Sequence, residues 1–295
     1  MRLAGLELGG TKVVVALSDA QSRDILGQPI VIPTTEPQAT VTAALRALET
    51  LEQRFGKAER LGIASFGPIG VTPGTPDYGR FYDTPKPGWS GFDLVSAILA
   101  ERPSLHIALD TDVNGAALGE ARWDPEADSD SLAYVTVGTG IGVGLLIHGR
   151  PVHGLMHPEA GHIRVQRHPD DPYQGHCPFH GDCLEGLACG PAIAARTGQP
   201  GEALAADHPV WDLTGYYLGQ LFSNLLLTLA VRSIRVGGGV GLHPAVLKAA
   251  RASTFEHLKG YLAPARSLES ISKIISPATL GDRAGLLGAI ALADH

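Results

Sequence analysis

The feature that most constrains the fold of this chain is a strand–glycine turn–strand segment that occurs twice. The first copy is predicted at Arg2–Glu7 and Val13–Leu17, around the turn LGGTK at 8–12. The second is predicted at 132–137 and 142–147, around VGTGIGVG at 137–144. Glycines let the backbone turn sharply and approach a ligand closely. Because helices and further strands follow each copy, the sequence predicts an α/β protein with two duplicated halves, each opening with a glycine turn.

The glycine turns themselves have two interpretations. The turn at 9–12 combines two glycines with Thr11 and Lys12 as donors for an anion, but a Gly-Gly pair between strands is also what a bare hairpin needs. The alternate glycines from 138 to 144 leave backbone N–H groups free to face a phosphate. Neither turn has the spacing of a Walker P-loop or of the Rossmann motif. A third glycine run at 237–239 follows a predicted strand, Ser233–Val236, and precedes a helix, where a nucleotide can lie against the backbone.

The rest of the chain alternates predicted helices and strands. Helices are expected at 38–55, 92–100, 113–122, from 190, 212–231, from 244 and at 282–292, and further strands at 61–65, 107–109 and 271–275. The segment 67–91 is rich in glycine, proline and aromatic residues. We expect it to be an ordered lip or a substrate-facing loop rather than a linker.

Residues 159–185 contain the densest cluster of chemically active side chains. His162, Cys177, His180 and Cys183 have the pattern H-x14-C-x2-H-x2-C. Thiolates and imidazoles in a set of four suit tetrahedral zinc, and the close spacing lets one tight turn present two ligands. The alternative is an exposed histidine-rich loop with two ordinary thiols. The histidines outside this set, including His153, are expected to be surface or packing residues.

Bulk properties exclude several classes of protein. Hydrophobic residues make up 44% of the 295 residues and charged residues 18%, which is typical of a globular chain rather than a disordered one. The formal charge of -7 argues against binding to nucleic acid or to an anionic membrane surface. The start of the chain does not have the pattern of a signal peptide. Three cysteines crowded between 177 and 189 are typical of reduced thiols in a cytoplasmic protein.

Polar side chains follow the predicted strand at 107–109, in the segment DTDVNG at 110–115. The carboxyl ends of strands are where open α/β sheets bind ligands, so Asp112 is a candidate for a functional carboxylate. Asp112 is also well suited to cap the helix that follows, and the two roles are compatible.

The ordered set of motifs resembles the ROK family of sugar kinases. The motifs are ELGGTK at 7–12, TDVNGAALGE at 111–120, VGTGIGVG at 137–144, EAGH at 159–162, CPFHGDCLEG at 177–186 and VGGGV at 236–240. Within the family, the form CPFHGDCLEGLA looks most like the bacterial fructokinases.

The resemblance implies a two-domain actin-like (ribonuclease H-like) ATPase fold. It implies an N-terminal α/β domain at 1–112, with the C-terminal helix at about 280–295 packing back on it, and a C-terminal α/β domain at 113–279 that carries the zinc loop 159–186. It further implies ATP, Mg²⁺ and structural Zn²⁺ as cofactors, a sugar as substrate, and a homodimer in the cytoplasm.

The resemblance also implies roles for matching residues. Asp112 matches the base that accepts the proton of the sugar hydroxyl. Sugar-binding positions match Gly67, Asp112, Glu159, His162 and Glu185. Phosphate- and nucleotide-binding positions match Gly9, Gly10, Thr11, Lys12, Gly138, Thr139, Gly140, Gly190, Gly238 and Gly239. The zinc ligands match His162, Cys177, His180 and Cys183.

Two departures from the family pattern bear on this interpretation. Glu7 stands where many members have aspartate, which lengthens the reach toward a bound Mg²⁺, and Thr111 stands where glucokinase-like members have asparagine. Both favour fructose over glucose. The sequence therefore predicts an ATP-dependent fructokinase, with a kinase for glucose, mannose or an N-acetylated hexose as the alternative.

Two other classes of protein compete with a sugar kinase as interpretations of the sequence. A zinc hydrolase needs an open coordination position, whereas four protein ligands close the site, so we expect a structural zinc. A ROK transcriptional regulator carries a helix-turn-helix ahead of the kinase-like body, and we expect none because the first predicted strand begins at Arg2.

Overall fold

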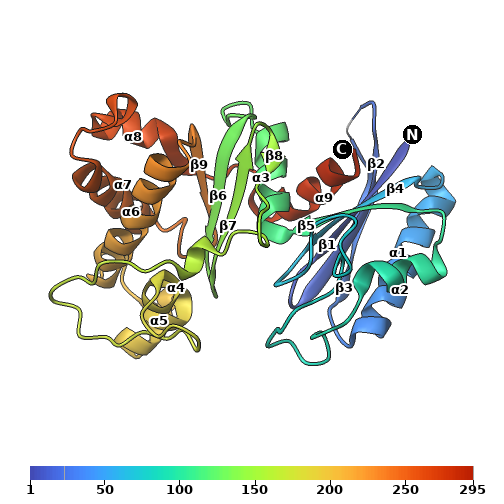
Figure 1. The fold of residues 1–295 in the computed structure, drawn as a ribbon, viewed down its shortest axis with the longest axis horizontal. Helices are drawn as coiled ribbons and strands as arrows, with labels where there is room; N and C mark the ends of the chain where they lie inside the picture. Colours follow the sequence, from blue (N-terminus) through green and yellow to red (C-terminus); the bar gives the residue numbers. More distant parts are fainter. Residues whose placement is uncertain (23, 295) are drawn as a thin grey trace. The chain divides into compact units, whose positions relative to one another are not determined.

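The computed structural model describes residues 1–22 and 24–294, and the chain forms two compact units (Figure 1). The first unit comprises Met1–Pro125, Arg150–His157 and the C-terminal segment from Leu280, and the second comprises Glu126–Gly149 and Pro158–Thr279. The first unit thus continues past residue 112 to include the next helix, and the C-terminal helix belongs to it.

The first unit is built on a five-stranded sheet of order β3-β2-β1-β4-β5. Its strands are β1 (Arg2–Leu8), β2 (Lys12–Asp19), β3 (Ile25–Pro33), β4 (Arg60–Ser65) and β5 (His106–Thr111). The pairs β1–β2 and β2–β3 are antiparallel, whereas β1, β4 and β5 run parallel. The carboxyl ends of these three parallel strands therefore lie at one edge of the sheet.

Successive side chains of each strand point to opposite faces of the sheet, so different helices pack on the two faces. Buried Leu6 and Leu8 pack with α1 (Pro37–Phe55) and α2 (Leu94–Glu101) in one apolar core. Helix periodicity in the sequence predicts a buried stripe on α1, and this is confirmed because its five residues are all buried: Val41, Ala44, Leu45, Leu48 and Leu51. Burying each leucine stabilises the fold by roughly 1.5–3 kcal/mol.

The opposite face of the sheet packs α9 (Ala284–Asp294) at unusually short range, and α9 also packs on α3 (Asp112–Trp123). A Cβ added to Gly62 of β4 would lie 1.8 Å from the Ala289 carbonyl oxygen. A Cβ on Gly288 would lie equally close, 1.8 Å, to the Gly115 carbonyl oxygen of α3. Glycine is therefore required at both positions, since no side chain fits between these backbones.

The second sheet has the order β10-β9-β6-β7-β8 and repeats the pattern of the first. Its strands are β6 (Ser131–Val137), β7 (Ile141–Ile147), β8 (Arg150–Pro151), β9 (Ser233–Gly237) and β10 (Ile275–Pro277). Strand β6 is antiparallel to β7 and parallel to β9, as β1 is to β2 and β4. The predicted duplication of two glycine-turn halves is therefore confirmed.

The α-helices of the second unit all follow Cys183, the last of the four candidate metal ligands, in the sequence. They are α4 (Leu184–Ala188), α5 (Gly190–Thr197), α6 (Val210–Thr228), α7 (Pro244–Leu258) and α8 (Leu268–Ile274), and the four short 3₁₀ helices of the described chain are η1 (Ala160–His162), η2 (Gly201–Ala203), η3 (Ala263–Ala265) and η4 (Gly281–Arg283). Helices α6 and α7 pack closely, and Gly215 allows this because a Cβ there would lie 2.4 Å from the Ala249 side chain.

Three expectations about elements were wrong. Strand β3 was not predicted, because it is an edge strand with Gly27 and Pro29 and its Val31 is 60% exposed. The strand expected at 271–275 is mostly helix α8, which begins with a capping box at Ser267, and only residues 275–277 form β10. Helix α6 ends at Thr228, three residues before the expected end.

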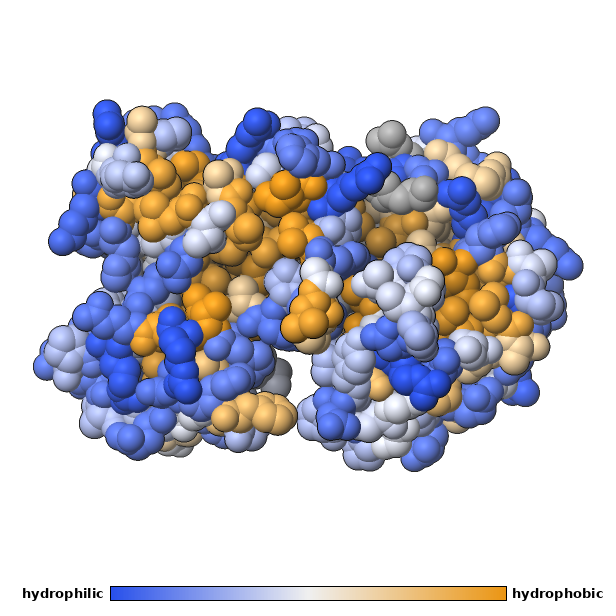
Figure 2. Space-filling model, viewed as in Figure 1, coloured by the Kyte–Doolittle hydropathy of each residue, from blue (hydrophilic) through white to orange (hydrophobic). Residues whose placement is uncertain are grey.

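The face shown in Figure 2 is mixed, with several groups of apolar residues between hydrophilic ones. Within the described residues, none of the helices combines the length and the apolar character needed to span a bilayer.

Candidate active site and metal centre

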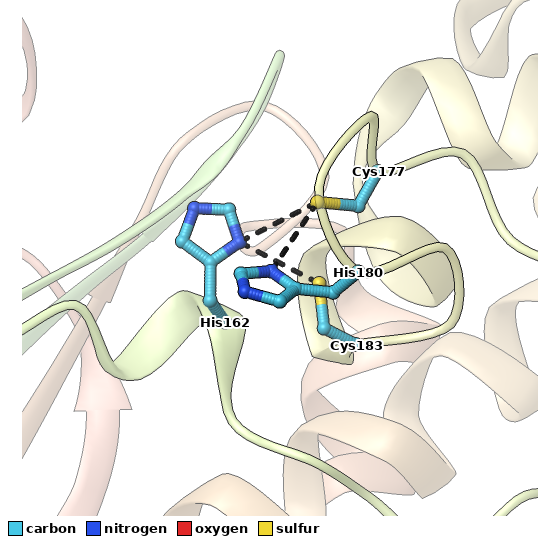
Figure 3. A group of neighbouring side chains, drawn as sticks. All are labelled: His162, Cys177, His180 and Cys183. Carbon is cyan, nitrogen blue, oxygen red and sulfur yellow. Dashed lines mark hydrogen bonds between the residues drawn. The ribbon is translucent and has the colours of Figure 1, made fainter. Parts of the chain in front are cut away.

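The side chains of His162, Cys177, His180 and Cys183 converge on one point in the second unit (Figure 3). Their ligand atoms all lie within 4.8 Å of one another. His162 ends the short helix η1, and Cys183 is the residue immediately before α4. Between them, Cys177 and Gly181 exchange backbone hydrogen bonds of 3.2 and 2.9 Å, which close the tight turn that presents Cys177 and His180.

The geometry of this cluster fits a tetrahedral zinc ion. The Cys177 Sγ lies 3.7 Å from His162 Nδ1 and 3.6 Å from His180 Nδ1, and the Cys183 Sγ lies 3.5 Å from His162 Nδ1. Zn–S bonds of about 2.3 Å and Zn–N bonds of about 2.05 Å at tetrahedral angles place sulfur and nitrogen about 3.6 Å apart. The observed separations match that value, so the donor set and its spacing both suit zinc.

The two thiols are held in a poorly solvated position. Cys177 is 7% exposed and Cys183 is fully buried. Burial, together with the neighbouring Cys177, raises the pKa of the Cys183 thiol to about 11. A cation at the centre of the cluster would reverse this, because thiolates bind zinc in the deprotonated form.

Glu185 links the metal loop to the glycine turn of the second unit. Its Oε2 accepts a 2.9 Å hydrogen bond from the Ile141 backbone N–H, and a Cβ on Gly140 would lie 2.7 Å from the same oxygen. Its Oε1 lies 3.9 Å from His162 Nε2. His162 therefore directs Nδ1 toward the sulfurs and Nε2 toward the Glu185 carboxylate. Glu159 lies at the other end of this group, and its carbonyl accepts the His162 N–H at 2.9 Å.

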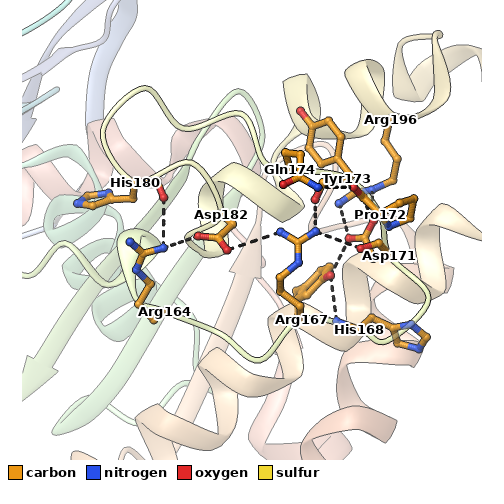
Figure 4. Close-up of polar contacts among 11 residues, drawn as sticks. Arg164, Arg167, His168, Asp171, Pro172, Tyr173, Gln174, His180, Asp182 and Arg196 are labelled. Carbon is orange, nitrogen blue, oxygen red and sulfur yellow. Dashed lines mark hydrogen bonds and ion pairs between the residues drawn. The ribbon is translucent and has the colours of Figure 1, made fainter.

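A buried carboxylate, Asp171, anchors the long segment between the ligands His162 and Cys177 (Figure 4). Arg196 of α5 donates to both of its oxygens at 3.3 and 3.0 Å, and the Tyr217 hydroxyl of α6 lies 2.6 Å from Oδ2. Burial favours the neutral acid, but the hydrogen bonds from Tyr217 and Arg196 prevail and lower the pKa of Asp171. Asp171 is thus an ionised hub that holds the segment against two helices.

A second set of contacts connects this hub to the metal turn. Arg167 donates to the Asp171 carbonyl at 3.0 Å and also lies 3.6 Å from the Asp182 carboxylate (Figure 4). Asp182 in turn pairs with Arg164, which donates to the carbonyl of the ligand His180 at 3.2 Å. None of these contacts requires a metal ion.

The predicted nucleotide-binding glycines of the second unit lie together at the carboxyl end of β6. The Gly190 N–H donates to the Gly138 carbonyl at 2.7 Å. Gly238 has a φ of 80°, and a Cβ there would lie 2.4 Å from the Val137 carbonyl oxygen. In contrast, a Cβ on Gly239 would meet no atom within 4 Å. Segments far apart in the sequence therefore form one glycine-lined edge of the sheet, which suits the close approach of a phosphate.

In the first unit, the turn at 9–12 closes the β1–β2 hairpin. Gly9 donates to the Lys12 carbonyl at 3.0 Å, and the Thr34 hydroxyl donates to the Gly9 carbonyl at 2.7 Å. Gly10, Thr11 and Lys12 are exposed. The turn is thus a hairpin whose tip is accessible, so both interpretations made from the sequence remain compatible with it.

Glu7 lies near the end of β1 beside other carboxylates. Burial is the largest cause that raises its pKa to about 7, and Asp112 and Asp282 raise it further while Lys12 lowers it. Gly285 lies close to this side chain, since a Cβ there would lie 2.5 Å from the Glu7 carboxylate. Asp282 is a neighbour of Glu7 that the sequence interpretation missed, and it is 275 positions away in the chain.

Asp112 is the first residue of α3, and the cap of that helix is Thr111. The Thr111 hydroxyl accepts the Asn114 N–H at 3.2 Å, which is the capping hydrogen bond. Asp112 instead accepts the N–H of Val113 at 2.8 Å. Because capping is done by Thr111, the Asp112 carboxylate is not needed for that structural role.

Asp110 and His153 were not recognised as partners from the sequence. Asp110 is 2% exposed, and its Oδ2 lies 2.9 Å from His153 Nε2. The hydrogen bond to Asp110 raises the pKa of His153. The interpretation of His153 as a surface or packing residue was therefore incomplete. The sequence signal for this pair was limited to the position of Asp110, two residues before Asp112.

Two large aromatic residues of the segment 67–91 are buried in the core of the first unit. Trp89 and Phe81 are 0% and 1% exposed, and they pack with Phe66 at ring-centroid distances of about 5 Å, namely 4.8, 5.0 and 5.2 Å among the three rings. Gly67 is placed near the ring of His157, which a Cβ on Gly67 would approach to 3.6 Å.

Comparisons with known proteins agree with this architecture. A model of the ROK family matches residues 3–295. A fructokinase from Pediococcus pentosaceus is 36% identical over 293 residues, which cover 99% of this chain and 98% of the relative. A crystal structure of a ROK hexokinase from Thermus thermophilus has a TM-score of 0.79 and 26% identity, with 99% and 98% of the two chains covered. A ROK family glucokinase from Streptomyces griseus, in complex with glucose and AMPPNP, has a TM-score of 0.70 and 24% identity, with 99% of each chain covered.

The solved relatives have the actin-like ATPase fold, and the two similar sheets found here share it. The family match extends over almost every residue of the sequence, from the first strand to the C-terminal helix. The chain therefore belongs to the ROK family.

Proposed function

We propose that this chain is an ATP-dependent sugar kinase that phosphorylates D-fructose to fructose 6-phosphate. The observation that carries the proposal is 36% identity to a fructokinase over 99% of the chain. Structural similarity to a ROK hexokinase supports the reaction class.

We assign to Asp112 the role of general base. Transfer of a phosphoryl group demands little covalent chemistry from a protein, which has mainly to position the sugar hydroxyl and the phosphate and to accept a proton. Asp112 stands at the carboxyl end of β5, at the first residue of a helix whose cap is a different side chain. A base in this position typically contributes on the order of 10²–10⁴-fold to the rate.

The nucleotide is assigned to the glycine-lined positions. The residues proposed to bind it are those that match the family's nucleotide-binding positions: Gly9, Gly10, Thr11, Lys12, Gly138, Thr139, Gly140, Gly190, Gly238 and Gly239. Backbone N–H groups let a chain of net charge -7 bind the polyanion ATP. Mg²⁺, when bound with ATP, would neutralise the phosphate charge, and we assign it to Glu7, two residues before the turn at 9–12, and to Asp112, a charged neighbour of Glu7.

The sugar hydroxyls are assigned to the residues that match the family's sugar-binding positions, namely Gly67, Asp112, Glu159, His162 and Glu185. Zinc, when bound by His162, Cys177, His180 and Cys183, would supply structural rigidity. With Nδ1 of His162 committed to the metal, its Nε2–H is left to donate beside the Glu185 carboxylate, 3.9 Å away. The His162 imidazole would then be oriented toward the sugar by its bond to a structural zinc ion.

The proposal is tested by an ATP-coupled assay across fructose, glucose, mannose and N-acetylated hexoses, with wild type and Asp112→Asn side by side. Fructose should give the highest kcat/KM, and the variant should lose at least 100-fold in kcat. A better hexose would refute the fructokinase assignment, whereas an Asp112→Asn variant of near wild-type kcat would refute the assignment of the base.

We further propose a homodimer located in the cytoplasm. Three free cysteines, two of them in a metal-binding set, support a reducing compartment. Light scattering of the purified protein tests the dimer directly, since a mass of 30.9 kDa would show a monomer instead.

A further inference from the structure

Asp110 is a buried carboxylate that contacts the residues on both sides of the proposed base. It lies one residue before the end of β5, paired with Ala64 of β4, and is 2% exposed. Its Oδ1 accepts the Thr111 N–H and the Asn114 side-chain amide, both at 2.8 Å. Asp112 lies between these two donors in the sequence, so the Asp110 carboxylate holds the backbone turn from which the base projects.

His153 completes the hydrogen bonding of this carboxylate from a distant part of the chain. Its Nε2 lies 2.9 Å from Asp110 Oδ2, and its side chain is 27% exposed. It belongs to Arg150–His157, a segment of the first unit with only two residues of strand, in which Leu155 is fully exposed. The contact therefore attaches a segment of little regular structure to the strand end beside the base.

The arrangement has the features of a positioning device rather than of simple packing. Leaving a buried carboxylate without a partner is unfavourable, and Asp110 meets this requirement through three separate hydrogen bonds. All three donors come from the turn around the base or from His153. A shift of about 1 Å in a reacting group can reduce a rate by about 100-fold, so a turn fixed at three points has a kinetic consequence.

We propose that Asp110 and His153 form a positioning pair that holds Asp112 in place for proton transfer. The inference rests on the proposed kinase function. Neither residue touches the substrate in this scheme; Asp110 acts through the turn at 111–114, and His153 acts through Asp110.

The test uses two amides of different length at position 153. In His153→Gln the side-chain amide can still reach Asp110 as a donor, whereas in His153→Asn it is one methylene shorter and cannot. We expect His153→Asn to lower kcat by at least 10-fold with KM for ATP within twofold of wild type, and His153→Gln to recover kcat to within threefold. The matched control is His148→Asn, which removes an exposed histidine 3.8 Å from Asp130 and should leave kcat unchanged.

Stability is measured in parallel by urea denaturation, so that misfolding is recognised. If His153→Asn does not fold, Asp110→Asn replaces it, since the amide keeps the shape but loses the charge, and the same 10-fold loss of kcat is expected. Equal kcat values for the Asn and Gln variants, or a kcat within twofold of wild type in the shorter variant, would overturn the positioning role. If wild type prefers another hexose, only the fructose assignment fails, and the kcat values of the variants relative to wild type are measured with that hexose. If wild type phosphorylates no sugar, both proposals fail.

Discussion

Replacing Glu7 with glutamine should make the protein more stable at alkaline pH. Glu7 lies near the end of β1, where burial, with Asp112 and Asp282 as further causes, raises the pKa of its carboxyl to about 7. Above that pH the folded protein must hold a poorly solvated carboxylate near two others. Glutamine has the same shape without the charge, so Glu7→Gln removes this unfavourable interaction.

The size of the effect follows from the change in pKa on folding. A rise from 4.5 to about 7 corresponds to about 3 kcal/mol of differential stability. Between these two pH values the folded protein retains the Glu7 proton while the unfolded chain releases it. The stability contributed by the protonated Glu7 carboxyl is therefore fully present below pH 4.5. It is lost as the pH rises through about 7, where Glu7 ionises in the folded protein.

The assay is urea denaturation of wild type and Glu7→Gln at pH 4.5, 6 and 8.5 without added Mg²⁺, followed by tryptophan fluorescence. Trp89 and Trp123 report on the first unit, which contains Glu7. The difference in unfolding free energy between the variant and wild type should grow by about 3 kcal/mol from the lowest to the highest pH.

The matched control is Glu49→Gln on the exposed side of α1, for which the difference should stay close to zero at every pH. A Glu7→Gln difference that does not change with pH would refute the reasoning, because it would mean that folding does not raise the pKa of Glu7. A variant that is less stable than wild type at pH 8.5 would show that the carboxylate has a stabilising partner.

Three further predictions concern the second unit. Gly238→Ala should lower the free energy of unfolding by roughly 2 kcal/mol and weaken ATP binding, whereas Gly239→Ala should do neither. Of these two glycines, Gly238 has a positive φ and a carbonyl oxygen 2.4 Å from the added Cβ. Equal melting temperatures of the two variants would contradict this. Asp171→Asn should lower the free energy of unfolding by roughly 3 kcal/mol or more and speed the release of zinc to a chromogenic chelator. Asp170→Asn, at a side chain that is 92% exposed, should change neither quantity. An unchanged release rate in Asp171→Asn would show that Asp171 stabilises the fold without affecting the metal site. Cys183→Ser should abolish the binding of zinc measured by mass spectrometry of metals and lower the melting temperature, and a full zinc content in that variant would refute the ligand set.

Local patterns in the sequence were sufficient where the structure depends on local physics. The stripe of α1 was predicted because helix periodicity places Val41, Leu45 and Leu48 on one side, and all are buried. The turn from Cys177 to Gly181 is also local, since its residues are neighbours in the sequence. The four metal ligands were proposed from spacing for the same reason, and the structure brings their donor atoms within 4.8 Å of one another.

Other features could not be derived from local patterns. Strand β3 exists because β2 provides backbone partners for it, although Gly27 and Pro29 disfavour a strand. The isoleucines at 271, 274 and 275 favour a strand by propensity, but the capping box at Ser267 and the burial of Ile271 stabilise helix α8. The buried aromatic cluster around Trp89 likewise depends on contacts across the fold.

The sequence by itself determined the family and the duplicated glycine-turn halves, and it supplied the proposal for the site residues, because motifs and periodicity record the identity and order of side chains. Only the tertiary structure decided which side chains meet. Asp110 is hydrogen-bonded to His153, 43 positions away, and Asp171 to Arg196 and Tyr217. Glu7 lies near the like charge of Asp282. The physical reason is that burial and hydrogen bonding between distant segments set the charge state and the orientation of a carboxylate, and neither can be read from its neighbours in the chain.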